Sequence, residues 1–434
     1  MRILHYFLGF NRAGGLNRYA ADLAATQVRC GHQVFALYPA GSFRKKAAIF
    51  ADGTERGVVK YKFVGGRPVP LLLGVGDPER MIDFPRKIAA ESVRDFCDLV
   101  HPDIVHVHTW MGFPDELLTE FKKRHVGIVF TTHDYYGFCP KVNLIDCDGR
   151  ICEEPDNARC SRCNMDAPSE RELALRNSHA LLLFKRALRP FANFLRRGRS
   201  RSASELICRD YAALKAYYVG LWKQCDLIHC NSEVSGEIYR KFLPEARFET
   251  IPISHSGIVD RRARKSVGAT IEFSFSGPGG AFKGLPQLLA VLTDMYRDGI
   301  RNWRLNVWGH DGSSTCPAIV YRGRYTAKKN AEVFQKSDLL IVPSMCHETF
   351  GFIVPEALMY GTPVLCSDTV GAKMLVAPEM VYSVKEELRK KLEFFCRNPH
   401  DLERINGDIC AAEFVMDMTT HTRKITDMYR NIGR

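Results

Sequence analysis

The sequence predicts an α/β protein made of two doubly wound domains, each a parallel sheet covered by helices on both faces. Three observations lead to this prediction. The chain has 434 residues, which is too many for a single hydrophobic core. Short apolar strands alternate with helical segments, and these strands lack the apolar–polar alternation of a sheet with one wet face. The alternation is interrupted by a polar and basic segment at 253–269, which we interpret as a hinge.

The first domain is expected to cover residues 1–253 and to open with a strand, a glycine loop and a helix. The strand at 3–8 is apolar, and the helix after Gly14-Gly15 repeats apolar residues at helical spacing. The other predicted elements are strands at 33–37, 103–108, 127–132 and 226–230 and a helix at 114–124.

The second domain is expected at 254–416, where the same pattern begins again. Its predicted strands lie at 272–276, 304–308, 339–343 and 363–367, and its predicted helices at 285–297, 327–335 and 356–360. In parallel α/β sheets, ligands bind beyond the carboxyl ends of the strands. Binding residues are therefore expected in the loops that follow the strands.

Composition and charge exclude several classes of protein. A net charge of +12 suits nucleic acid, an anionic membrane or a phosphorylated small molecule. No RNP, zinc-finger or helix-turn-helix pattern is present, so we expect no nucleic-acid partner. The N-terminus has no signal-peptide pattern, and no apolar run reaches about 18 residues. We therefore expect a cytoplasmic protein whose fifteen cysteines are mostly reduced thiols.

Two glutamates flank a turn in the second domain. Glu348 lies in the loop after the strand at 339–343, and Glu356 lies on the next helix. Gly351 lets a ligand approach the backbone between them, and the first amides of a helix suit a pyrophosphate. Carboxylates on either side of such a site accept hydrogen bonds from sugar and ribose hydroxyls.

With its surroundings at 338–344 and 356–364, this segment resembles the E-x7-E signature of the family 4 retaining glycosyltransferases. The resemblance implies the GT-B fold, in which two Rossmann-like domains face a central cleft, with acceptor residues in the first domain and a nucleotide-sugar donor on the second. It implies that Glu348 contacts the donor sugar, that Glu356 contacts the ribose, and that backbone at Phe350, Gly351 and Phe352 holds phosphate. A last helix at about 417–434 is expected to pack back on the first domain.

A glycine-rich loop at 277–284 supplies a cation to the same site. Lys283 is placed to balance a leaving diphosphate, and Lys283-Gly284 resembles the family's Lys-Gly pair. The family's arginine five or six residues earlier is absent here, because those positions hold Gly277 and Pro278. We expect Gly277 to line the donor site. Arg324 and Tyr325 lie where the nucleotide base packs in the family, or else are ordinary surface residues.

Three short segments of the first domain are expected to complete the site. Gly14 and Gly15 resemble the glycine loop whose amides approach the donor phosphates. His133 follows the strand at 127–132 and matches the family's strand-end histidine, so we expect a catalytic role for it beside Lys283 and Glu348. His108 and Asp134 are expected on the acceptor side, with simple packing as the alternative for His108.

A cysteine-rich loop at 139–163 has two interpretations. Its Cys139, Cys152, Cys160 and Cys163 would hold a structural zinc tetrahedrally, and the stretch resembles one found in a subset of bacterial family 4 sequences. Alternatively, these are reduced cysteines on an insertion. The Asp146-Cys147-Asp148 triplet lies far from the phosphate elements, so we expect no catalytic metal and no cofactor requirement.

A basic helical insertion is expected at about 165–224. Between 176 and 201 it contains arginines, one lysine and apolar residues but no acidic residue. Such a segment either binds an anionic membrane surface or packs its apolar face on the first domain. Membrane binding would suit a peripheral enzyme with a lipid-linked acceptor.

The sequence thus predicts a retaining glycosyltransferase that moves a sugar from a nucleotide donor to an acceptor hydroxyl, on a saccharide or a lipid-linked carrier, in bacterial surface polysaccharide or glycoconjugate synthesis. A nucleotide-sugar epimerase of the same architecture and a non-catalytic nucleotide-sugar-binding protein are the alternatives. A dinucleotide oxidoreductase is disfavoured because no G-x-G-x-x-G follows the first strand.

Overall fold

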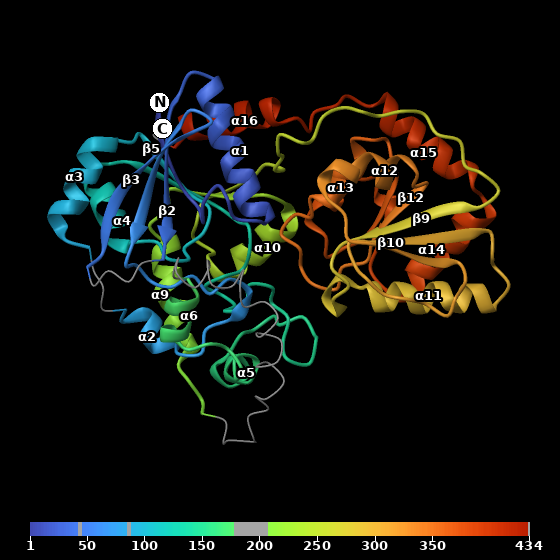
Figure 1. Ribbon diagram of the computed structural model, residues 1–434, viewed down its shortest axis with the longest axis horizontal. Coiled ribbons are helices and arrows are strands. Elements are labelled where there is room, and N and C mark those ends of the chain that lie inside the picture. Colours follow the sequence, from blue (N-terminus) through green and yellow to red (C-terminus); the bar gives the residue numbers. More distant parts are fainter. Residues whose placement is uncertain (42–45, 85–87, 178–206, 433–434) are drawn as a thin grey trace, which may run out of the picture. The chain divides into compact units, whose positions relative to one another are not determined.

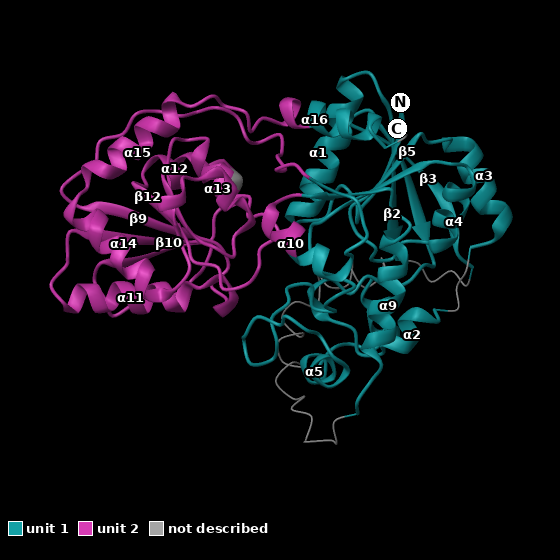
Figure 2. Cartoon of the chain, turned by 180° about the vertical axis from the view of Figure 1, so that it is seen from behind, with its two compact units in different colours: residues 1–230, 238–249, 422–434 teal, residues 231–237, 250–421 magenta. Residues whose placement is uncertain are grey.

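The structure, a computed structural model, describes residues 1–41, 46–84, 88–177 and 207–432. It contains two compact units (Figure 2). Unit 1 consists of Met1–Cys230, Ile238–Glu249 and Thr422–Arg434, and unit 2 consists of Asn231–Glu237 and Thr250–His421. The chain therefore passes between the units four times: after strand β7 (Leu227–Cys230), within helix α10 (Glu233–Phe242), within strand β8 (Phe248–Thr250) and within helix α16 (Met418–Arg430).

Unit 1 is built on an eight-stranded sheet in the order β3-β4-β2-β1-β5-β6-β7-β8. Neighbouring strands from β4 to β7 in this order pair in parallel, whereas β3 and β4 form an antiparallel hairpin at one edge that the sequence pattern did not predict. The strands are β1 (Arg2–Tyr6), β2 (Gln33–Ala40), β3 (Ala48–Glu55), β4 (Val58–Val64), β5 (Ile104–Val107), β6 (Gly127–Thr131), β7 (Leu227–Cys230) and β8 (Phe248–Thr250).

Helices connect the parallel strands of unit 1. Helix α1 presents small residues to the sheet, among them Ala20 and Ala24, which pack with Val34 and Val58 in one buried cluster. In α4, acidic residues in the first turn and lysines in the last turn complement the helix dipole. The helices are α1 (Gly15–Arg29), α2 (Pro78–Ile82), α3 (Ala90–Val100), α4 (Asp115–Lys123), α5 (Asn157–Cys163), α6 (Glu170–Arg176) and α9 (Tyr211–Trp222).

Unit 2 has a six-stranded, wholly parallel sheet in the order β11-β10-β9-β12-β13-β14. Numbered from its own first strand, this is the 3-2-1-4-5-6 order of a doubly wound domain. The order reverses between β9 and β12, which therefore flank the topological switch point. The strands are β9 (Ile271–Ser276), β10 (Trp303–Trp308), β11 (Ile319–Gly323), β12 (Leu339–Val342), β13 (Val364–Ser367) and β14 (Val381–Tyr382).

The helices of unit 2 cover both faces of this sheet, with α11 and α14 on one side and α12 and α13 on the other (Figure 1). Phe273, Leu288 and Trp303 are fully buried at the centre of the core. Burial of such side chains contributes roughly 1.5–3 kcal/mol each. The helices are α11 (Leu285–Arg297), α12 (Asn330–Gln335), α13 (Ile353–Leu358), α14 (Lys385–Arg397) and α15 (His400–Ala411).

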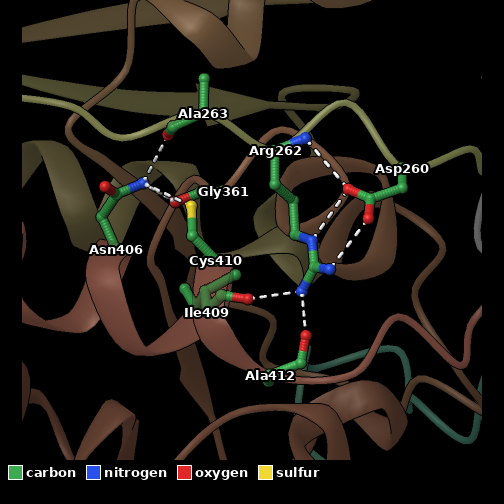
Figure 3. A network of polar contacts seen from close by, with 8 residues as sticks. All are labelled: Asp260, Arg262, Ala263, Gly361, Asn406, Ile409, Cys410 and Ala412. Carbon is green, nitrogen blue, oxygen red and sulfur yellow. Dashed lines mark hydrogen bonds and ion pairs between the residues drawn. The ribbon is translucent and has the colours of Figure 1, made fainter.

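The segment 253–269, expected as a hinge, belongs to unit 2 and is fastened to it by side chains (Figure 3). Arg262 donates to the carbonyls of Ile409 and Ala412 at 2.5 and 2.8 Å, where α15 ends. Asn406 donates to the carbonyl of Ala263 at 3.1 Å. An arginine beside the last carbonyls of a helix satisfies groups that have no intrahelical partner. The polar residues of the expected hinge thus bond to α15, and the chain enters unit 2 just before this segment, at Thr250.

Helix α16 returns the end of the chain to unit 1. Tyr429, on its last turn, is buried and bonds to residues of α1 and β5. Within the described part of the chain, no helix combines the length and apolar character needed to span a bilayer.

Candidate functional site

A cavity of about 630 Å³ opens in unit 2 at the carboxyl ends of its strands. Its walls come from the ends of β9, β10, β11 and β12, so it lies at the switch point where ligands of doubly wound domains bind. Seven sequence-predicted donor residues line it: Gly277, Lys283, Arg324, Tyr325, Glu348, Gly351 and Phe352. Residues far apart in the sequence are thus brought together as predicted.

Lys283 ends a short 3-10 turn, Ala281–Lys283, between β9 and α11. Gly284, with φ +73°, follows it and passes so close to β12 that an added Cβ would lie 1.6 Å from the carbonyl oxygen of Pro343. Only glycine combines this backbone conformation with this approach. The Lys-Gly pair therefore holds the lysine against the end of β12.

Lys283 and Glu348 form an ion pair on the wall of the cavity. The Nζ of Lys283 lies 2.9 Å from Oε1 of Glu348, and the two side chains are 27% and 10% exposed. The hydroxyl of Ser344 donates to the same carboxylate oxygen. A cation held beside a cavity by one neutralising carboxylate is available to a competing anion such as a diphosphate.

The turn after Glu348 leads into α13. Gly351 has φ +96°, and an added Cβ there would approach Oε2 of Glu348 to 3.3 Å, so a side chain would crowd the carboxylate. Phe352 lines the cavity, whereas Phe350 is buried beneath it and does not. The backbone at Phe350 thus positions the turn, and its side chain belongs to the core.

Glu356 lies on α13, outside the set of residues that line the cavity. Its Oε1 is 3.0 Å from Nε2 of His255, a buried histidine whose ring also contacts Phe352. Sequence reasoning missed His255, because it lies in the segment interpreted as a hinge and no motif singles it out. Ser344 and His310 also lie on the cavity wall, although neither was predicted as a site residue.

Arg324 and Tyr325 occupy the rim where β11 ends. Tyr325 shares a hydrogen bond of 2.6 Å with the hydroxyl of Ser276, and burial raises its pKa above the usual value. Arg324 is 84% exposed and lies 3.4 Å from a carboxylate oxygen of Asp311. Surface pairs of this kind hold a side chain only weakly, with about 0–1 kcal/mol, so the guanidinium can turn toward a ligand.

In unit 1, the predicted glycine loop lies between β1 and α1. Gly14 has φ +118° and occupies the N-cap position of α1, and Gly15 is the first residue of that helix. Both are exposed, and nothing lies within 4 Å of a Cβ added to Gly14. Their amides are therefore open at the N-terminus of a 15-residue helix, where the dipole favours an anion.

His133 and Asp134 follow β6 and are half-buried. Loss of hydration lowers the pKa of His133 to about 3, so its imidazole is neutral at pH 7, and raises the pKa of Asp134 to about 6. His108, expected on the acceptor side, is 1% exposed, with its ring nitrogens facing His5 and His133. It can therefore act on a ligand only through His133.

The cysteine loop is less well gathered than a zinc site. Loss of hydration, then the nearby Cys139, Cys152 and Cys163, raise the pKa of the Cys160 thiol to about 12. The Cys163 thiol also hydrogen-bonds with Cys147, which is not among the four predicted zinc ligands. Among the described residues, only one group of three or more histidine, cysteine or acidic side chains has its ligand atoms within 4.8 Å of one another, and it contains no cysteine. The zinc site stays a prediction.

The basic stretch at 176–201 lies almost wholly outside the described residues; only Arg176 and Asn177, at the end of α6, fall inside them. The interpretation of this stretch therefore stays a prediction too.

Family models match both parts of the chain. Residues 13–155 match the model described as Glycosyltransferase Family 4, and residues 318–406 match the model described as Glycosyl transferases group 1. The second match includes Glu348 and Glu356, and the first includes His133 and the glycine loop. No curated protein sequence matches the chain significantly.

Solved structures with the same architecture include enzymes that differ widely in sequence. A sucrose-phosphate synthase from Thermosynechococcus elongatus is 13% identical, with a TM-score of 0.59 over 99% of this chain and 98% of that one. HepE of Anabaena, in complex with UDP and glucose, is 13% identical, with a TM-score of 0.55 over 99% and 100%. The catalytic domain of starch synthase IV from Arabidopsis thaliana, bound to ADP and acarbose, is 12% identical, with a TM-score of 0.54 over 100% and 99%.

These likenesses agree with the parallel sheets of the two units and identify the fold as GT-B. The family models match the segments that carry the glycine loop and the two glutamates. The chain therefore belongs to the family 4 type of GT-B glycosyltransferases and is a nucleotide-sugar glycosyltransferase.

Proposed function

We propose that this chain is a retaining glycosyltransferase that binds a nucleoside diphosphate sugar in the switch-point cavity of unit 2. The observation that carries the proposal is the Lys283–Glu348 ion pair on the wall of that cavity, between the ends of β9 and β12. This pair supports a site in which the cation meets a diphosphate and the carboxylate meets a sugar hydroxyl. Without such a pair, a glycine-lined cavity would be a poor argument for this chemistry.

Each polar group has a role in the proposed reaction. The bond between the anomeric carbon and the diphosphate oxygen breaks, and both electrons pass to the diphosphate, whose charge Lys283 stabilises. The acceptor hydroxyl then attacks the same face of the oxocarbenium-like carbon, and its proton passes to an oxygen of the departing diphosphate on that face. Glu348 holds a sugar hydroxyl, Glu356 holds the ribose, and the neutral His133 accepts a hydrogen bond from the sugar. Preorganised charges of this kind usually supply the largest share of catalysis.

Arg324 supplies the second cation in this proposal. The glycine-rich loop has no arginine at Gly277 or Pro278, yet Arg324 lines the same cavity from the end of β11. Its pairing with Asp311 is exposed and weak, which leaves the guanidinium able to reach a phosphate. The arrangement thus restores two positive charges to the donor site from a different strand.

The proposed donor carries a nucleoside diphosphate, whose base can be identified by a binding screen. HepE of Anabaena binds UDP and UDP-glucose, and starch synthase IV binds ADP. We expect a UDP- or GDP-linked sugar to raise the melting temperature of this protein, and Glu356→Ala to weaken that response. Glu386→Ala, at an exposed position on α14, is the matched control.

The acceptor is proposed to be a saccharide or a lipid-linked carrier in bacterial surface polysaccharide synthesis. Support comes from the basic, acid-free stretch at 176–201, which suits an anionic bilayer surface. Cosedimentation with anionic but not neutral vesicles would support membrane binding, and equal recovery with both would oppose it.

The decisive measurement is the product. With a stabilising donor and an acceptor extract, the anomeric configuration of the new bond is expected to equal that of the donor, as read from proton coupling constants. Inversion would overturn the retaining mechanism. Donor binding without transfer or hydrolysis would indicate a non-catalytic binding protein, and isomerisation of the donor sugar would indicate an epimerase.

A further inference from the structure

Five histidines gather at the carboxyl ends of the central strands in unit 1. They are His5 on β1, His106 and His108 at the end of β5, His133 after β6 and His229 on β7. All except the half-buried His133 are fully buried. Loss of hydration lowers the pKa of His5 to about 4 and that of His108 well below its usual value. A buried imidazole that stays neutral carries its proton on either Nδ1 or Nε2, and its hydrogen-bond partners determine which tautomer forms.

Hydrogen bonds join these rings into one chain of side chains. From the surface inward, Nε2 of His133 lies 3.2 Å from Nδ1 of His108, and Nε2 of His108 lies 3.0 Å from Nδ1 of His5. Nε2 of His5 then lies 2.7 Å from Oε1 of Gln27, on α1. The first half of this hydrogen-bonded chain thus links His133 to a buried amide.

The second half continues from the other end of that amide. Nε2 of Gln27 lies 3.3 Å from the hydroxyl of Tyr429, which lies 2.6 Å from Nδ1 of His106. Nε2 of His106 lies 2.5 Å from the hydroxyl of Thr131, which lies 2.9 Å from Nδ1 of His229. Tyr429 lies on α16, so the C-terminal helix joins the two halves of this hydrogen-bond network.

The amide of Gln27 gives the first half its direction. An amide oxygen only accepts, so Nε2 of His5 must carry a hydrogen, and the Nδ1 of this neutral ring must accept. Nε2–H of His108 therefore donates to His5, and Nε2–H of His133 donates to Nδ1 of His108. Each ring in this half is in the Nε2–H form.

The same amide directs the second half. Its nitrogen only donates, so the oxygen of Tyr429 accepts from Gln27 and its own hydrogen goes to Nδ1 of His106. The reverse arrangement would leave the phenol hydrogen buried without an acceptor in the chain, at a cost of about 1–3 kcal/mol. Nε2–H of His106 then donates to Thr131, whose hydroxyl also hydrogen-bonds with Tyr19. With Tyr19 as the donor to Thr131, Thr131 donates to Nδ1 of His229, and all five histidines are Nε2–H tautomers.

A metal ion is the competing interpretation. His5, His106 and His108 have ligand atoms within 4.8 Å of one another, and buried neutral imidazoles are good zinc ligands. However, the facing nitrogens of His5 and His108 bond to each other, and both nitrogens of His106 bond to hydroxyls. A metal would have to break these contacts, so the observed geometry favours the hydrogen-bonded chain.

We propose that Gln27 and Tyr429 are positioning residues that hold His133 in its Nε2–H tautomer, which leaves Nδ1 as the accepting nitrogen. What that nitrogen accepts from, a hydroxyl of the donor sugar, rests on the proposed function. The tautomer itself does not. Helix α16 therefore contributes to the site through Tyr429, without touching the ligand.

The test is nitrogen-15 NMR of the histidine rings in the full-length protein, which distinguishes the two neutral tautomers from each other and from the charged form. We expect five Nε2–H tautomers at pH 7. In Tyr429→Phe, Gln27 loses the partner that orients it, so mixed tautomers are expected from His5 to His133. Transfer activity should then show kcat lowered by a factor of about two to ten at a nearly unchanged donor KM, because only a fraction of molecules is competent.

Two further variants keep the proposal falsifiable if Tyr429→Phe folds poorly. Gln27→Glu replaces the donating nitrogen with an acceptor, so Tyr429 should turn round and His106 and His229 should become Nδ1–H tautomers, while His108 and His133 keep theirs. Tyr218→Phe removes another buried, hydrogen-bonded phenol of unit 1, one outside the chain. It should leave all five rings unchanged.

Three results would overturn the proposal: an Nδ1–H or charged His133 in the wild type, unchanged tautomers in both chain variants, or a stoichiometric metal whose removal by a chelator shifts the resonances of His5, His106 and His108. If the tautomers are as expected but no donor is bound or transferred, the hydrogen-bonded histidine network is confirmed and the proposed function is wrong.

Discussion

The imidazole of His255 donates its Nε2–H to the carboxylate of Glu356 across 3.0 Å, and the backbone determines which nitrogen is the donor. The amide N–H of Gly257 points at Nδ1 of the same ring at 3.0 Å, so Nδ1 must accept and Nε2 must carry the hydrogen. His255 is completely buried. Glu356 is therefore oriented by a residue some 100 positions before it in the chain.

Replacing His255 with alanine is expected to weaken donor binding. Without its partner, the carboxylate of Glu356 loses one hydrogen bond and its fixed orientation, a loss of about 1–1.5 kcal/mol. The donor KM should rise roughly five- to tenfold, with a smaller effect on kcat. His400→Ala is the control, because His400 makes a similar 2.9 Å contact to Glu403 on the exposed side of α15. An unchanged KM in His255→Ala would contradict the role.

Replacing Lys283 with methionine is expected to reduce kcat by about 10²–10³, the loss found when a preorganised group that stabilises transition-state charge is removed. Methionine keeps the length of the side chain but not its charge. Steady-state kinetics with the best donor therefore measures the contribution of the charge to kcat. Lys391→Met is the control: Lys391 is 21% exposed and pairs with Glu387, much as Lys283 pairs with Glu348. Equal losses in the two variants would indicate a general effect on stability.

Arg324→Ala is expected to raise the KM for the donor and to lower kcat several-fold, with a larger effect at low salt, because an exposed cation is screened by ions. Arg297→Ala is the matched control, since Arg297 is also exposed and lies 3.6 Å from an aspartate, Asp294, on α11. Kinetics of both variants at two salt concentrations measures the difference. If they behave alike, another residue supplies the second cation.

Acid is expected to destabilise the protein through its buried histidines. The usual histidine pKa is 6.5, whereas those of His5 and His133 are about 4 and 3 in the fold. Above pH 6.5 these histidines are neutral in both the folded and the unfolded protein. Below pH 6.5 the unfolded protein binds protons that the buried rings of the folded protein do not bind. Stability is therefore lost as pH falls from 6.5 toward 4, by about 2 kcal/mol per histidine at pH 5.

Asp134 opposes this trend. Its pKa is about 6 in the folded protein, against 3.8 ordinarily, so on acidification the folded protein binds this proton before the unfolded protein does. Lowering the pH from 7 to 5 therefore raises the free energy of unfolding by about 1 kcal/mol through this group. Urea unfolding at pH 7, 6 and 5 should show a steeper loss in Asp134→Asn than in the wild type. A stability that rises between pH 7 and pH 5 would contradict the sign of this argument.

The cysteine loop predicts one zinc ion per chain. Metal analysis of protein purified without chelator should find about one equivalent, and Cys160→Ser should lose it, because a structural site needs all four ligands. Cys97→Ser, a buried cysteine on α3, is the control. Absence of zinc from the wild type would favour reduced cysteines.

Local sequence was sufficient for the elements with strong periodicity. The helix predicted at 285–297 is α11 with the same bounds, and the strands predicted at 304–308 and 339–343 differ from β10 and β12 by one residue at one end. The hairpin of β3 and β4 was missed, because its exposed, irregular residues carry no clear alternation. Where burial repeats regularly, the pattern is visible in the chain; where a strand pairs only at an edge, it is not.

By itself, then, the sequence determined the two α/β units, the glycine loops and the pair Glu348 and Glu356, because these depend on short-range spacing that a motif records. Only the tertiary structure decided that Lys283 and Glu348 pair, that His255 orients Glu356, and that Tyr429 closes the histidine chain. These contacts join residues from 65 to more than 300 positions apart, and the sheet order brings them together through long-range packing that no local pattern encodes.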